Sequence, residues 1–88
     1  MKYTVKIVRS FYNDKAVREK KQIEELYFHN SLDAALIAYN SSIIGERITS
    51  ELNSFTGSTN FIVSLIVKYH DETITLESVF IHNGEVMQ

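Results

Sequence analysis

Hydrophobic and polar residues alternate along three segments of the chain, and a period of two is typical of half-buried β-strands. These segments are Lys2–Phe11, Asn60–Tyr69 and Thr73–Ile81. Val8 and Arg9 interrupt the alternation of the first segment, so we expect that strand to end or to bulge there. Residues 70–72 (His-Asp-Glu) are polar and predict a tight turn between the last two strands.

A fourth strand is predicted at Gln22–His29, although its period is ambiguous. Its β-forming residues cluster late, at Leu26, Tyr27 and Phe28, and the segment is short. Tyr12–Lys21 is polar and charged, and it begins with the turn-prone pair Asn13-Asp14. We interpret Tyr12–Lys21 as a loop whose later part can already belong to the second strand, which makes a long hairpin with a mobile tip.

A helix is predicted to start after Asn30-Ser31, because either residue can act as an N-cap and Asp33 lies in the first turn. Apolar residues then recur at spacings of three and four, at Leu32, Ala35, Leu36, Tyr39 and Ile43. A second stripe, offset by one residue, consists of Ile48, Leu52 and Phe55. Gly45 either caps the helix or interrupts it. The pattern therefore predicts one kinked helix or two helices, ending near Asn53.

The order β-β-α-β-β predicts an α+β protein with a single domain over residues 1–88. Its antiparallel four-stranded sheet would carry the helix on one face. In the last strand we expect Ile74, Leu76 and Phe80 to face the helix. The face away from the helix would then present four apolar residues: Ile62, Ile66, Val79 and Ile81. An exposed apolar patch usually marks an interface, so we expect a homodimer or a surface for a protein partner.

The sequence lacks the patterns that would indicate catalysis, a metal or a cofactor. There is no cysteine, and none of the three histidines lies at metal-ligand spacing from another ligand. There is no G-x-S-x-G motif, and the three glycines are isolated. Glu24 and Glu25 are adjacent on a strand and so point to opposite faces. We therefore expect a protein that is not an enzyme and has no catalytic, metal or cofactor site.

The location follows from the apolar runs, which are too short for a signal peptide or a membrane span. We expect a cytoplasmic protein of a bacterial host.

Charge is unevenly placed along the chain. Residues 1–30 hold seven basic and four acidic residues, whereas residues 31–88 hold two basic and seven acidic ones. A basic segment formed by Lys15, Arg18, Lys20 and Lys21 follows Tyr12, and cations beside aromatic residues are suited to nucleic acids. The isoelectric point of about 5.9 is low for such a protein. The acidic remainder can instead face a basic groove on a partner protein.

The whole chain resembles a class of small proteins in its short length, its lack of cysteine and proline, and its many Asn, Ser, Ile and Lys residues. The segment YFHNSLDAAL at residues 27–36, which leads from strand into helix, adds to this likeness. The chain is similar to small accessory proteins of phages and mobile elements of low-GC bacteria, among them the anti-CRISPR inhibitors. The resemblance implies a protein that works by binding rather than by turnover.

Three hypotheses of function follow. The first is a non-enzymatic protein that docks on a host or phage protein and inhibits it by steric occlusion. Its contact surface would combine Ile62, Ile66, Val79 and Ile81 with a mobile rim of Tyr12, Lys15, Arg18, Lys20 and Lys21. The second is a small nucleic-acid-binding or regulatory protein that uses the basic hairpin 12–21. The third is a small enzyme assembled across subunits, which no local motif supports.

Overall fold

The architecture comes from a computed structural model, which describes residues 2–13 and 16–87 and, for residues 13 and 16–20, the backbone only. The elements in chain order are β1 (Lys2–Asn13), β2 (Ala16–His29), α1 (Leu32–Asn53), β3 (Gly57–Tyr69), β4 (Glu72–His82) and β5 (Glu85–Met87). The strands form one antiparallel sheet in the order β2-β1-β3-β4-β5.

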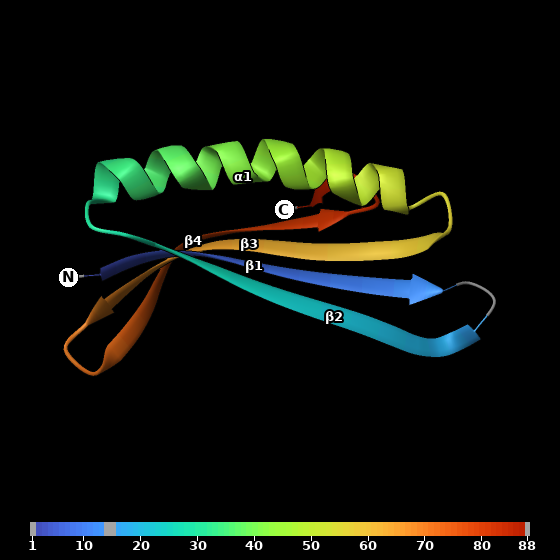
Figure 1. The fold of residues 1–88 in the computed structure, drawn as a ribbon, viewed down its shortest axis with the longest axis horizontal. Coiled ribbons are helices and arrows are strands. Elements are labelled where there is room, and N and C mark those ends of the chain that lie inside the picture. Colours follow the sequence, from blue (N-terminus) through green and yellow to red (C-terminus); the bar gives the residue numbers. More distant parts are fainter. Residues whose placement is uncertain (1, 14–15, 88) are drawn as a thin grey trace.

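Figure 1 shows the two layers of this α+β fold, with α1 running along one face of the sheet. The predicted α+β class is confirmed, but the described chain has the order β-β-α-β-β-β, and its sheet has five strands rather than four. The fifth strand, β5, pairs with β4 from Phe80 to His82. Asn83 and Gly84 both have positive φ, as a two-residue hairpin turn of type I′ requires. The residues after this turn are therefore carried back along β4.

The first hairpin is longer than the alternation predicted. β1 does not end at Arg9, because its pairing with β2 continues without a shift to Tyr12. Arg9 can occupy a helix-side position of β1 among apolar residues, because its guanidinium group forms ion pairs with Glu25 and Glu46 there. The later part of Tyr12–Lys21 does belong to the second strand, and the strand predicted at Gln22–His29 is confirmed. The predicted hairpin tip at residues 14–15 lies outside the described residues.

α1 is one continuous helix through Gly45. Of the two predicted N-caps, Ser31 is the one used, because its Oγ accepts a hydrogen bond from the Ala34 N–H at 3.2 Å. Gly45 is exposed, and nothing lies within 4 Å of the place where a Cβ atom would stand. Gly45 therefore neither ends the helix nor makes room for a neighbour.

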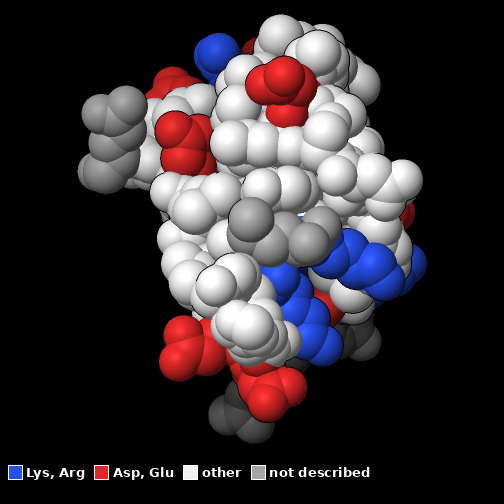
Figure 2. All heavy atoms as spheres, turned by 90° about the vertical axis from the view of Figure 1, so that its left-hand side faces the viewer, with Lys and Arg blue, Asp and Glu red and all other residues white. Residues whose placement is uncertain are grey.

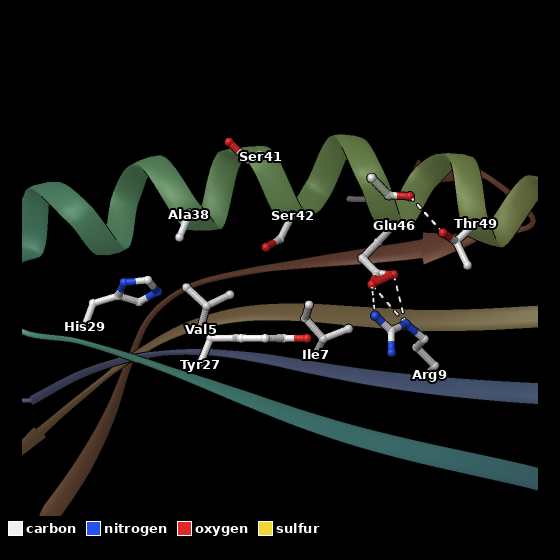
Figure 3. A pocket seen from close by; sticks show the side chains of 11 residues that line it. Val5, Ile7, Arg9, Tyr27, His29, Ala38, Ser41, Ser42, Glu46 and Thr49 are labelled. Carbon is white, nitrogen blue, oxygen red and sulfur yellow. Dashed lines mark hydrogen bonds and ion pairs between the residues drawn. The ribbon is translucent and has the colours of Figure 1, made fainter.

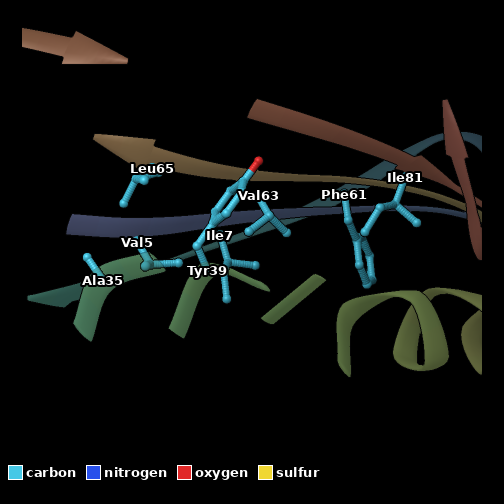
Figure 4. Close-up of a cluster of buried hydrophobic side chains, with 8 residues drawn as sticks. All are labelled: Val5, Ile7, Ala35, Tyr39, Phe61, Val63, Leu65 and Ile81. Atoms are coloured by element: carbon cyan, nitrogen blue, oxygen red, sulfur yellow. The ribbon is translucent and has the colours of Figure 1, made fainter. Parts of the chain in front are cut away.

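The core lies between α1 and the three central strands. Val5 and Ile7 of β1, Phe61, Val63 and Leu65 of β3, and Ile81 of β4 meet Ala35 and Tyr39 of the helix (Figure 4). Phe11 packs edge-on against Phe61, with ring centroids 5.4 Å apart. Small and large side chains therefore interlock beneath the first half of α1, which ties the helix to β1, β3 and β4.

The expected orientation of β4 is wrong at its C-terminal end, whereas Ile74, opposite Val67, lies on the helix side as expected. Ile81 is opposite Phe61 and Val79 is opposite Val63, so both point toward the helix. Ile81 is fully buried in the core, and Phe80 faces the other way, opposite Ile62. Both faces of β4 carry apolar residues, so its alternation could not indicate which face lies inside. A bulge opposite Leu65 and Ile66 also changes the phase of the strand along its length.

The position of Gly45 leads to a prediction about stability. Gly45→Ala should raise the free energy of unfolding by about 1 kcal/mol, because alanine restricts the unfolded chain and fits an open helix surface. Urea denaturation followed by circular dichroism measures the change. Gly84→Ala is the control and should destabilise, because Gly84 has φ +87° and its added Cβ would stand 2.6 Å from Glu51 Cβ. A loss of stability in Gly45→Ala would contradict the account of the helix.

Candidate interaction surfaces

The outward side of α1 carries large apolar residues that touch no other layer. We define the outer stripe as Ile37, Ile44, Ile48, Leu52 and Phe55, the last lying just beyond the end of the helix. At 100° per residue these positions lie opposite Ala35 and Tyr39, which face the sheet. Ile37 is 70% exposed and Phe55 80% exposed. The helix is therefore apolar on two sides.

A helix that is apolar on two sides normally has both sides covered. Five large side chains on this side of α1 each have more than half of their surface exposed, and large exposed apolar patches usually mark interaction sites. Part of this surface is visible in the sequence, because Ile48, Leu52 and Phe55 form a stripe that is offset by one residue from the stripe that begins at Leu32. Ile37 and Ile44 were missed, because each looks like an irregularity within the inner pattern.

The open face of the sheet, which is the face away from α1, is the second apolar surface. Across its centre, Val8, Ile62, Phe80 and Met87 lie in one row on four neighbouring strands. Ile66 lies on the same face, next to Thr4 and Thr75. Near the other edge, Lys2 stands over the ring of Phe28 at 5.3 Å. This surface is less exposed than the outer stripe and is interrupted by lysines, serines and threonines.

The structure separates the residues predicted to form one contact surface. Ile62 and Ile66 lie on the open face as expected, whereas Val79 and Ile81 do not. The register places Tyr12 on the open face and Lys21, opposite Phe11, on the helix side. These two residues therefore do not share a rim. Lys15 lies outside the described residues, and for Arg18 and Lys20 only the backbone is described.

A groove of about 470 Å³ runs between α1 and the first hairpin (Figure 3). Val5, Ile7 and Tyr27 form its floor, and small residues of the helix, including Ala38, Ser42 and Gly45, form its wall. His29 lies at one end and the Arg9–Glu46 pair at the other. Because the helix side chains are small here, α1 leaves the inner side of β2 largely uncovered. The groove has one helical wall and opens toward the edge of the sheet.

Arg9 is held between two carboxylates at the end of the groove. Its Nε lies 2.9 Å from both carboxylate oxygens of Glu46, and its second contact, Nη1 to Glu25 Oε1, is 2.7 Å. Glu46 is only 5% exposed, so the ion pair joins α1 to β1 in a largely buried place. The three side chains together carry a net charge of −1.

These contacts shift the ionisation of the groups involved. Hydrogen bonding to Glu46 raises the pKa of Arg9 above its ordinary value, against the effect of burial. Hydrogen bonds from Arg9 and then from Tyr27 lower the pKa of Glu25. The hydrogen bond between Tyr27 and Glu25 raises the pKa of Tyr27, because the Tyr27 hydroxyl donates to the Glu25 carboxylate. The shifts are those of a structural ion-pair network.

A second network fixes the far end of the helix. Ser50 Oγ lies 2.6 Å from Thr59 Oγ1 and accepts from the Gly84 N–H at 2.9 Å. Asn83 Oδ1 accepts from the Thr59 N–H at 2.9 Å. This buried group of hydrogen bonds joins α1, the start of β3 and the β4–β5 turn, so its role is structural.

Figure 2 faces the end of the molecule where α1 begins, and much of that surface is uncharged. Within the described residues, no group of three or more His, Asp or Glu side chains is placed to hold a metal ion. The described part of the chain also has no helix that is both long and apolar enough to cross a membrane.

Comparison with protein-family models finds no match, and comparisons with curated proteins and with solved structures find none either.

The buried ion pair gives a prediction about stability. Arg9→Met should lower the free energy of unfolding by about 3 kcal/mol, because Glu46 would keep its burial and lose its cation. Urea denaturation measures the loss. The double variant Arg9→Met/Glu46→Leu is the matched control and should recover most of it, because no buried charge then remains. A double variant as unstable as the sum of the single changes would show that the pair is not coupled.

The contacts of Glu25 give a prediction about pH. Tyr27→Phe should raise the pKa of Glu25 toward its ordinary value, while Arg9 continues to lower it. Carboxyl-carbon NMR over a pH titration measures this pKa, and Tyr69→Phe, which is remote from Glu25, should leave it unchanged. Because the pKa is lowered by folding, Glu25 stabilises the fold above its unfolded pKa, and this contribution disappears as pH falls through the folded pKa. An unchanged pKa in Tyr27→Phe would contradict the hydrogen bond.

Proposed function

We propose that the protein is a non-enzymatic binding protein whose outer stripe docks into an apolar groove of another protein. The observation that carries this proposal is the outer stripe itself. Helix-in-groove recognition uses apolar anchors at spacings of three, four and seven along one side of a helix. Ile37, Ile44 and Ile48 are seven and four residues apart, and all three are more than half exposed.

The outer stripe is favoured over the open face of the sheet for two reasons. Its residues are more exposed, since Ile44 is 65% exposed and Ile62 37%. From Ile44 to Phe55 the stripe also has an apolar residue at every turn, whereas Lys6 and Lys68 lie among the apolar residues of the open face. A hollow of about 180 Å³ beside Ile44 and Ile48, bordered by Arg47, can receive a side chain of the partner.

The charge of the chain defines the chemistry of the partner. Asp33 and Glu51 are exposed on α1 beside the stripe, and residues 31–88 hold seven acidic and two basic residues. Arg47 is turned aside, with its Nε donating to the Gly84 carbonyl oxygen at 3.3 Å. A groove that is apolar along its centre and basic at its rim is complementary to such a helix.

Binding of this kind inhibits by occlusion, because a stable body placed over a groove excludes the natural ligand. No reacting group is needed. The resemblance to phage accessory proteins supports a host or phage protein as the target, with a bacterial defence protein as one such target. The open face, through Ile62 and Ile66, is the alternative contact, and the basic hairpin 12–21 is the alternative for nucleic acid.

The test compares two single substitutions in tagged protein used for affinity capture from a nuclease-treated bacterial lysate. Ile44→Glu should reduce recovery of the specific partner at least tenfold, because it places a carboxylate in the centre of an apolar contact. Ile62→Glu, on the open face, is the matched control and should leave recovery unchanged. Both residues are exposed, so circular dichroism and urea denaturation should show nearly unaltered folds.

Three outcomes would overturn the proposal. A partner lost with Ile62→Glu but not with Ile44→Glu would assign binding to the open face. Recovery that nuclease abolishes would assign it to the hairpin 12–21. A protein partner captured equally by both variants would show that neither apolar surface carries the contact.

A further inference from the structure

The edge of the sheet formed by β2 is long and without a partner strand in the described chain. β2 has 14 residues and pairs only with β1, whereas the opposite edge, β5, has three. The pairing with β1 shows no shift from Tyr3 to Tyr12, and the chain has no proline. From Lys20 to His29, β2 thus lacks the bulges and the prolines by which proteins usually protect an edge, and the shift in its pairing lies between Ala16 and Lys20. Its outward backbone groups can pair with another strand.

We propose that this strand is β2 of a second copy of the chain, antiparallel to the first, with the two-fold axis beside Ile23. Charge supports this choice of partner. Along β2, Lys20 and Lys21 precede Glu24 and Glu25. Antiparallel pairing of two such strands brings the basic half of each against the acidic half of the other, whereas parallel pairing would bring like charges together.

The two-fold symmetry and the side-chain alternation restrict the register. If the two-fold axis is perpendicular to the sheet, one residue of β2 must face its own copy. The numbers of any two paired residues then add up to twice the number of that residue, so this sum changes in steps of two from one allowed register to the next. With Ile23 on the axis, Lys21 faces the partner's Glu25 and Gln22 faces the partner's Glu24. Each contact occurs twice, and residues 20–26 of the two copies are paired along the regular part of β2.

The neighbouring registers are electrostatically worse. Placing Gln22 on the axis would put Lys21 opposite the partner's Ile23, so that Lys21 would no longer face Glu25. Placing Glu24 on the axis would put Glu24 opposite its own copy, and like charges directly opposite each other destabilise a sheet. The Ile23 register keeps Lys21 opposite Glu25 and sets two isoleucines against each other at its centre.

The ion pairs of Arg9 with Glu46 and Glu25 also favour a basic residue of the partner opposite Glu25. Glu46, Arg9 and Glu25 leave one negative charge uncompensated near the edge of the sheet. Lys21 of the same chain is four residues from Glu25, or about 13 Å along the strand. The partner's Lys21 would have its Cα about 5 Å from that of Glu25. Pairing would therefore give each half of the dimer a row of four charges of alternating sign, formed by Glu46, Arg9, Glu25 and the partner's Lys21.

The dimer would also complete the groove. The two sheets would join into one, with both α1 helices on the same face, so the groove beside β2 would gain a second wall from the partner subunit. The outer stripe points away from the sheet and stays uncovered in both copies. The dimer is thus independent of the proposed docking of α1, and each can fail without the other.

Sedimentation equilibrium of the full chain should give twice the monomer mass of 10.2 kDa at concentrations of tens of micromolar. Lys21→Glu should raise the dissociation constant at least tenfold, because it sets carboxylate against carboxylate twice. Lys68→Glu is the matched control: it makes the same charge change on an exposed lysine of β3 and should leave the mass unchanged. A monomeric mass for the natural chain throughout this range would overturn the proposal.

Cross-linking tests the register, and the absence of natural cysteine makes each introduced cysteine unique. Ile23→Cys should form an intermolecular disulfide under mild oxidation, because position 23 faces its own copy across the axis. Ile44→Cys, on the outer stripe, should form it at least tenfold more slowly. Faster cross-linking through position 44, or a dimer mass that Lys21→Glu does not change, would assign the interface to α1 and overturn the proposal.

Discussion

A single helix is the only cover that this sheet has in the described chain, and the other features follow from that constraint. A helix is about 10 Å wide, whereas five strands at about 4.8 Å spacing are nearly twice as wide. α1 can therefore bury the central strands, where Phe61, Val63 and Leu65 supply the core, and cannot also cover β2. The groove beside Tyr27, the apolar open face and the outer stripe are the surfaces that this arrangement leaves exposed.

Within that arrangement, Arg9 takes the place of an apolar residue at the limit of the core. Its position on the helix side of β1 puts it beneath α1, and Glu46 lies above it, largely buried. Glu25 then approaches from β2, so the cluster links all three elements that border the groove. The same carboxylate places an unbalanced negative charge at the strand edge. The core, the groove and the edge are thus connected by one ion-pair network.

The outer stripe, the edge of β2 and the open face have different consequences for binding. The outer stripe has an apolar residue at every turn from Ile44 to Phe55, which suits burial in a groove of another protein. The edge of β2 has backbone hydrogen-bonding groups and an ordered set of charges, which suits a strand of defined direction. The open face mixes apolar residues with lysines and is the weakest of the three. A small protein with two such surfaces on different layers can assemble and bind a partner at the same time.

The sequence by itself determined the local structure: strands where side chains alternate, a helix after Ser31, and turns at Asn83-Gly84 and near His70. These features depend on residues close together in the chain, which is why their period and their caps indicate them. Only the tertiary structure decided which face of each element lies inside. Val79 and Ile81 are as apolar as Ile62 and Phe80, and pairing with Phe61 and Val63 alone turns them inward. Likewise, Ile37 and Ile44 are exposed because α1 packs on a single sheet and can turn only one of its two apolar sides toward it.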